Sequence, residues 1–162
     1  MTDKERFDWA RDKIVGTVRE RQGIGTLSEK TVHAVLKNYY APDEDMHEIP
    51  IEGSVADIYT GTEIVEIQTR SFDRMRDKLR KFLPLYPVTI IYPIPYEKWL
   101  IWIDEETGEF SSRRKSPVKG NAYAAFRELY KIKNFLLEEN LHFKFVFLNM
   151  EEYRLLNGWS RD

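Results

Sequence analysis

The strongest constraint on the fold is a pair of short apolar segments separated by Gly61-Thr62. Two loop residues with glycine first are typical of the tight turn that joins neighbouring antiparallel strands. A two-residue loop also fixes the register, so that Asp57 lies opposite Glu66. On the other face of the same hairpin, Ile58 lies opposite Val65, which makes that face apolar and the carboxylate face polar.

The two opposed carboxylates require a compensating charge. Directly opposed side chains have Cβ atoms roughly 4.5–5.5 Å apart, and like charges at that separation destabilise a sheet. A divalent cation would compensate, because Mg²⁺ binds one or two carboxylates together with water and phosphate oxygens. The predicted metal ligands are Asp57, Glu66 and the Ile67 carbonyl, with the Gln68 amide beside them. The alternative is a solvated hairpin face on which Arg70 forms a salt bridge.

Hydrophobic periodicity along the chain predicts an α/β domain with a mixed central sheet flanked by helices. Proline and glycine residues separate most of the periodic segments. The expected elements are helices over 3–21 and 28–41, strands over 46–51, 54–60 and 63–69, a helix over 72–83, strands over 88–92 and 98–104, a helix over 121–138, a strand over 142–148 and a short helix over 151–156.

The domain organisation follows from the absence of any internal repeat, low-complexity tract or flexible linker in the 162 residues. A chain of this length is expected to form one compact domain. Residues 1–25 are the predicted N-terminal amphipathic helix. Residues 26–162 are the predicted main domain; the family resemblance described below implies a core over 26–95 and leaves a C-terminal strand-helix-strand extension over 96–162.

The composition bounds the compartment and the partners. There is no cysteine, so disulfide bonds and thiolate metal sites are excluded, and a reducing, cytoplasmic location is expected. The N-terminus has no apolar core of a signal peptide, and no stretch has the length of a membrane span, so no membrane partner is expected. The net charge of −2 argues against a protein that coats nucleic acid through bulk positive charge.

Two local basic segments are nevertheless candidates for phosphate contacts. Arg70, Arg74 and Lys78 lie on or beside the helix predicted over 72–83, although a solvated helix face with intrahelical ion pairs is an equal alternative. The predicted loop around 113–115 has no such acids nearby and is the better candidate, although a mobile surface loop without a binding role is an equal alternative. Its basic residues are Arg113, Arg114 and Lys115.

Two motifs resemble those of a known superfamily. The segments Gly53-Ser54-Val55-Ala56-Asp57-Ile58 and Ile64-Val65-Glu66-Ile67-Gln68-Thr69 resemble the signature of the PD-(D/E)XK nucleases. The preceding helix, which contains Glu29, is similar to the helix of archaeal Holliday-junction resolvases that donates a further carboxylate. The resemblance covers residues 26–95 and implies a restriction-endonuclease-like fold.

The resemblance implies an endonuclease that hydrolyses phosphodiester bonds in DNA with Mg²⁺ or Mn²⁺. A bound metal ion lowers the pKa of the attacking water and neutralises charge that develops on the phosphate. Many resolvase-like nucleases act as dimers, so a homodimer is compatible with the resemblance, although the N-terminal helix could equally cover the domain's own core. The implied catalytic residues are Glu29, Asp57, Glu66 and Gln68.

Gln68 departs from the family pattern, because it stands where the nuclease lysine usually lies. An amide can coordinate a metal ion or orient water, but it cannot stabilise a developing anion as an ammonium does. Lys30, Arg70 or Lys78 would have to supply that charge. Two alternatives therefore stay open: a catalytically lapsed nucleic-acid-binding protein with the same fold, and a regulatory interaction domain with no nucleic-acid role.

Overall fold

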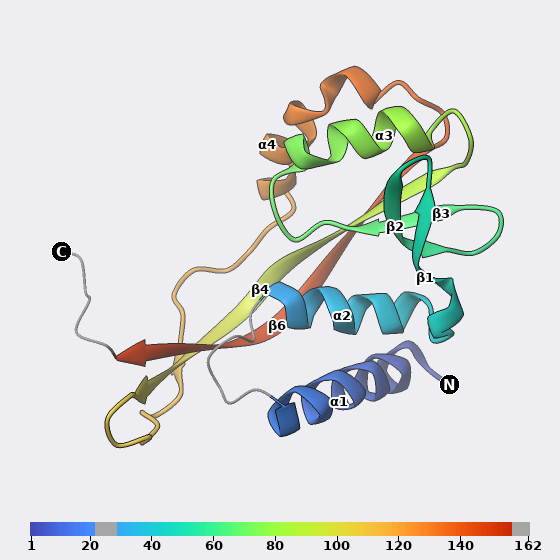
Figure 1. The fold of residues 1–162 in the computed structure, drawn as a ribbon. Helices are drawn as coiled ribbons and strands as arrows, with labels where there is room; N and C mark the ends of the chain where they lie inside the picture. Colours follow the sequence, from blue (N-terminus) through green and yellow to red (C-terminus); the bar gives the residue numbers. More distant parts are fainter. Residues whose placement is uncertain (22–28, 157–162) are drawn as a thin grey trace.

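The computed structural model describes residues 1–21 and 29–156 of the chain (Figure 1). Two helices precede a group of three strands, further helices and strands follow, and short 3₁₀ turns (η) precede or follow some of them. The elements are α1 (Asp3–Arg21), α2 (Glu29–Tyr40), η2 (Glu44–Met46), β1 (His47–Ile51), β2 (Ser54–Tyr59), β3 (Ile64–Ile67), η3 (Phe72–Met75), α3 (Arg76–Phe82), β4 (Val88–Asp104), β5 (Arg114–Lys115), α4 (Ala124–Lys131), η4 (Lys133–Phe135) and β6 (Leu141–Leu156).

The six strands form one mixed sheet. Strands β1, β2 and β3 are an antiparallel meander, and β4 then runs parallel to β3. On its other edge, β4 is parallel to β6 along the full length of both strands. The short strand β5 pairs antiparallel with the distal part of β4. The predicted α/β class with a mixed central sheet flanked by helices is therefore confirmed.

Helices cover both faces of the sheet (Figure 1). On one face, Leu36 of α2 belongs to a buried cluster with sheet residues that include Ile67 and Ile91. On the other face, Leu79 and Phe82 of α3 pack with the sheet. Helix α1 lies against α2, where the rings of Phe7 and Tyr39 meet edge to face, 6.0 Å between centroids. Among the described residues, no helix has both the length and the apolarity needed to cross a membrane.

The β2–β3 hairpin has the predicted register, with Ile58 opposite Val65. The turn closes as expected around Gly61, whose φ of 93° lies in the left-handed region that glycine adopts without a Cβ penalty. The carboxylate face is not solvated, however, so the alternative of a solvent-exposed hairpin face is wrong. Every side chain of β3 is buried, because α3 covers the face that carries Glu66 while α2 covers the other.

Strand β4 is one continuous element where the sequence predicted two strands, over 88–92 and 98–104; Pro93 and Pro95 lie between them. Proline cannot donate to a ladder, so it is confined to positions whose N–H would face no partner. The Gln68 N–H donates to the Ile91 carbonyl. The backbone N–H and C=O groups of odd-numbered residues in this part of β4 therefore point toward β3. Both prolines are odd-numbered and follow the last β3 pair, at Ile91, so neither interrupts a hydrogen bond to β3.

Two predicted helices differ from the structure. The helix expected over 121–138 is shorter, because the backbone leaves helical geometry at Ile132 (φ −118°, ψ 25°), where the buried side chain joins the core. The short helix expected over 151–156 is wrong, since β6 continues to Leu156 in register with β4. Its Glu- and Leu-rich sequence favours a helix locally, and pairing with β4 overrides that preference.

The cluster between α3 and the sheet is expected to hold the fold together. Phe82 is fully buried there, whereas Leu137 is 95% exposed. Phe82→Ala should lower the free energy of unfolding by about 3–5 kcal/mol, because a large cavity replaces the ring. Leu137→Ala should change it by less than about 0.5 kcal/mol. Urea denaturation followed by circular dichroism measures both, and equal effects of the two substitutions would contradict this core assignment.

Candidate active site

A pocket of about 230 Å³ lies beside the C-terminal end of β3, between α2 and the η3–α3 segment. The sequence-predicted residues Asp57, Glu66 and Gln68 are brought together in its wall. The structure adds a histidine from α2 and cations from the η3–α3 segment. The lining residues with a titratable, charged or amide side chain are His33, Asp57, Glu66, Gln68, Arg70, Arg74 and Lys78.

The two carboxylates occupy the place where the β2–β3 ladder ends. Beyond the pair Ile58–Val65, side-chain oxygens replace main-chain carbonyls as acceptors. The Asp57 N–H donates to Oε1 of Glu66 (3.1 Å), and the Ile67 N–H donates to Oδ2 of Asp57 (2.8 Å). The backbone of each strand therefore binds a carboxylate of the other, which fixes the two acids side by side.

Glu66 is the most constrained of these acids. Its side chain is almost fully buried, and the Lys78 ammonium of α3 donates to Oε2 at 2.7 Å. Burial, and next the negative charge of Asp57, raise the pKa of Glu66 to about 7, although Lys78 opposes the shift. Near neutral pH this carboxyl is consequently poised between its neutral and ionised forms, a property that is concentrated at functional sites.

Asp57 is shifted in the opposite direction. Burial alone would raise its pKa, but the hydrogen bond and charge of His33, together with the Ile67 N–H, hold the pKa of Asp57 below its ordinary value. His33 Nε2 lies 3.1 Å from Asp57 Oδ2. The sequence placed His33 one helical turn after Glu29, but it did not predict this contact, because the packing of α2 on the hairpin was unknown.

Gln68 lines the pocket but does not supply a charge. Its side-chain N–H₂ donates to the Ser71 carbonyl (2.7 Å), which fixes the amide against the chain that leads into η3. The ammonium nearest to the carboxylate pair comes instead from Lys78, one of the three cations proposed as a substitute for the family lysine. Arg70 and Arg74 also line the pocket, so the basic helix contributes to its charge.

Two predicted ligands are less well defined. Glu29 begins α2, but its side chain lies outside the described residues, so its catalytic role stays a prediction. Ile67 lines the pocket, and its N–H is engaged by Asp57. Within the described part of the chain, no group of three or more His, Cys, Asp or Glu side chains is arranged to hold a metal ion. The described oxygen donors are thus a carboxylate pair, which is the number Mg²⁺ commonly takes from a protein.

The basic residues at 113–115 do not line the carboxylate pocket and form contacts with β4 and β6 instead. Arg113 pairs with Glu151 (3.1 Å) and Lys115 with Glu97 (2.7 Å), while Arg114 pairs with β4 as part of β5. The premise that this loop has no acids nearby is therefore wrong, because β4 and β6 bring them in. Contact of the three cations with nucleic acid stays a prediction, weakened by these ion pairs.

Comparisons with known proteins identify the relatives of the chain. The sequence model of a family described as "Domain of unknown function (DUF8091)" matches residues 30–162. An uncharacterized protein of Treponema pallidum (strain Nichols) is 32% identical over 130 residues, 79% of this chain and 51% of that relative. The chain thus spans about half the length of the relative. No solved structure matches the chain significantly.

The raised pKa of Glu66 predicts a pH-dependent stability. Between about pH 4.5 and 7 the folded protein keeps a proton on Glu66 that the unfolded chain releases, so the contribution of this group to stability falls as the pH rises. Glu66→Gln removes that dependence. The free energy of unfolding of wild type relative to Glu66→Gln should fall by about 2–3 kcal/mol from about pH 5 to about pH 8.

Urea titrations at both pH values measure this difference. Glu105→Gln, which alters an exposed acid in the turn after β4, is the control and should track wild type. A difference between wild type and Glu66→Gln that does not change with pH would show that Glu66 titrates normally.

Proposed function

We propose that this chain, which belongs to the DUF8091 family, is a metal-dependent nuclease of the PD-(D/E)XK type that hydrolyses phosphodiester bonds in DNA. One observation carries the proposal: two acids on neighbouring strands, Asp57 and Glu66, are bound to each other's backbone in a pocket where Lys78 supplies the ammonium. The order of the surrounding elements, α2-β1-β2-β3-α3-β4, supports it, since it is the order that the resemblance implies for the core.

The donor set fits a hard divalent cation such as Mg²⁺ or Mn²⁺. Asp57 and Glu66 would hold it. Burial and the neighbouring charge of Asp57 raise the pKa of Glu66, and a bound cation would offset both effects by stabilising the ionised carboxylate. When bound, the ion supplies an activated water at neutral pH and neutralises charge on the scissile phosphate. A carboxyl with a pKa of about 7 ionises readily enough at physiological pH to serve as a ligand.

The protein's own side chains would do the remaining work. Lys78 stands at the pocket wall, where its ammonium can donate to a phosphate oxygen and stabilise the negative charge that grows in the transition state. His33 holds the Asp57 carboxylate ionised and oriented through its hydrogen bond. Arg74 lines the same pocket and can contact a neighbouring phosphate.

Cleavage of plasmid DNA tests the proposal. Wild-type protein with Mn²⁺ or Mg²⁺ should convert supercoiled plasmid to nicked or linear DNA, and EDTA should abolish the conversion. Asp57→Asn keeps the shape of the side chain but removes its charge, and should reduce the rate by at least about 100-fold. Lys78→Met should reduce it by about 10- to 1000-fold, because an apolar side chain cannot stabilise the developing anion.

The same helix offers a matched control. Asp77 and Lys81 form an ion pair of 2.8 Å on the exposed side of α3, so Asp77→Asn and Lys81→Met make the same chemical changes outside the pocket. Both control variants should retain wild-type cleavage. Absence of metal-dependent cleavage by folded wild-type protein would reject the enzyme, and the lapsed nucleic-acid-binding protein, which the amide at Gln68 favours, would then be the better description.

A further inference from the structure

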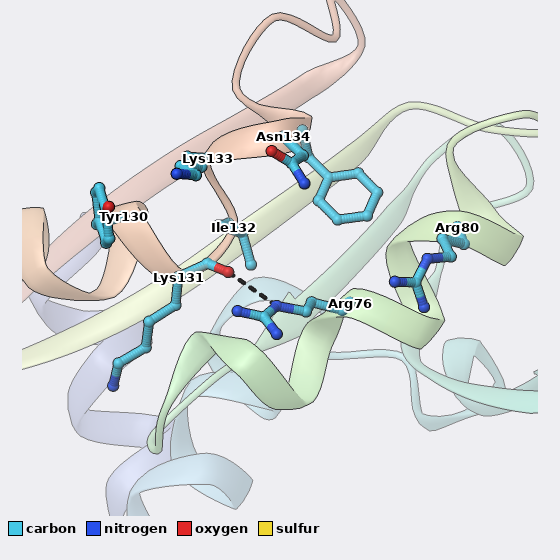
Figure 2. Close-up of a pocket in the computed structure, with 8 residues that line it drawn as sticks. Arg76, Arg80, Tyr130, Lys131, Ile132, Lys133 and Asn134 are labelled. Atoms are coloured by element: carbon cyan, nitrogen blue, oxygen red, sulfur yellow. Dashed lines mark hydrogen bonds between the residues drawn. The ribbon is translucent and has the colours of Figure 1, made fainter.

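A second, larger pocket of about 500 Å³ lies on the other side of α3, between that helix and the segment from Tyr130 to Phe135 (Figure 2). Figure 2 shows Arg76 and Arg80 extending from α3 toward this segment, with Lys133 and Tyr130 across from them. The Arg76 side chain is fixed there, because its Nε donates to the Lys131 carbonyl at 2.9 Å. Neither Asp57 nor Glu66 lines this pocket, so it is separate from the site described above.

The charge of this pocket selects an anionic ligand. Four cations and no acid are found among the described residues that line it. Lys131 turns its ammonium away to Glu128 and Ser71. The acids of α3 and α4 form their ion pairs with Lys81 and Lys131, and although Asp77 also attracts Arg80, the remaining three cations leave the pocket positively charged. They are Arg76, Arg80 and Lys133.

An aromatic stripe continues from the pocket along α4. Tyr123, Phe126 and Tyr130 recur at helical spacing, and their exposed fractions are 76%, 62% and 69%. The rings of Tyr123 and Phe126 are neighbours, 5.9 Å apart, and the Lys133 ammonium lies 4.8 Å from the centroid of Tyr130. Exposed rings interleaved with cations are uncommon on a surface that meets only water.

We propose that this surface, the cationic pocket together with the aromatic stripe of α4, binds an unpaired DNA strand. Bases stack on exposed aromatic rings and the backbone follows neighbouring cations, which is the combination that single-stranded nucleic acids require. In a duplex the faces of the bases are already stacked on each other, so rings such as Phe126 and Tyr130 gain no partner. Unpaired DNA is therefore favoured over duplex DNA.

The surface is connected to the carboxylate pocket through shared elements. The η3–α3 segment contributes Arg74 and Lys78 to the carboxylate pocket and Arg76 and Arg80 to the cationic one. Ser71 links the two as well, since its carbonyl accepts from Gln68 and its hydroxyl accepts from the Lys131 ammonium. As a substrate site the surface rests on the proposed nuclease function, for which it specifies a strand that is unpaired next to the cleaved bond.

Binding can be measured without cleavage. In an Asp57→Asn background with EDTA, fluorescence anisotropy with a labelled oligothymidylate of about 12 nucleotides should give tighter binding than a duplex of the same length. Adding Phe126→Ala and Tyr130→Ala should weaken binding of the single strand about tenfold or more, because two stacking platforms are lost. Adding Arg80→Ala and Lys133→Ala should reduce the slope of log K against log salt by about one to two.

A matched control uses a ring and a cation elsewhere. Phe110 is 53% exposed near the distal end of β4, and Lys119 is exposed in the chain that follows β5, so Phe110→Ala with Lys119→Ala should leave binding unchanged. Thermal unfolding monitored by circular dichroism checks that each variant is folded. Equal or tighter binding of the duplex, unchanged binding by the aromatic variant, or an equal loss in the control would each overturn the proposal.

The two proposals fail separately. Binding at this surface without metal-dependent cleavage would retain the strand-binding surface and reject the nuclease. Cleavage that persists at the wild-type rate on single-stranded DNA after Phe126→Ala and Tyr130→Ala would retain the nuclease and reject this surface as its substrate site.

Discussion

The exchange of carboxylates between β2 and β3 is the interaction on which the rest of the site depends. An ordinary ladder would pair main-chain N–H groups with main-chain carbonyls, but here the Asp57 N–H is bound by Glu66 and the Ile67 N–H by Asp57. If either carboxylate left the pocket, the backbone N–H that it accepts from would lose its hydrogen-bond partner, which costs about 1–3 kcal/mol for each group. Hydrogen bonding of the backbone thus holds two acids together, and burial together with the charge of Asp57 raises the pKa of Glu66.

Helix α3 lies between the carboxylate pocket and the cationic pocket. Its buried residues, among them Leu79 and Phe82, anchor it on the sheet, so its polar residues are held in fixed directions. One side of the η3–α3 segment delivers Lys78 to the carboxylates, and the other delivers Arg80 to the cationic pocket. A single short segment therefore lines both pockets with charged side chains.

The sequence predicted the hairpin because two local signals agree there: Gly61 specifies the turn, and alternation then specifies which residues are opposed. It could not choose between Lys78 and the other candidate cations, since the choice depends on how α3 crosses the sheet. It also could not find the contact of His33 with Asp57, for the same reason. The predicted helix over 151–156 is wrong because the local sequence favours a helix, whereas residues up to Leu156 pair with β4, which the local sequence does not reveal.

The prolines of β4 have a consequence for the site that lies beside them. After Ile91, the next N–H that β4 could offer to β3 would belong to residue 93, and proline has none. The hydrogen-bond ladder between β3 and β4 therefore ends here, and the chain after Ile67 does not continue as a strand. It is released to turn at Gln68, hydrogen-bond to Ser71 and enclose the carboxylates. Two missing donors on one strand thus determine where its neighbour stops, and with it where the pocket begins.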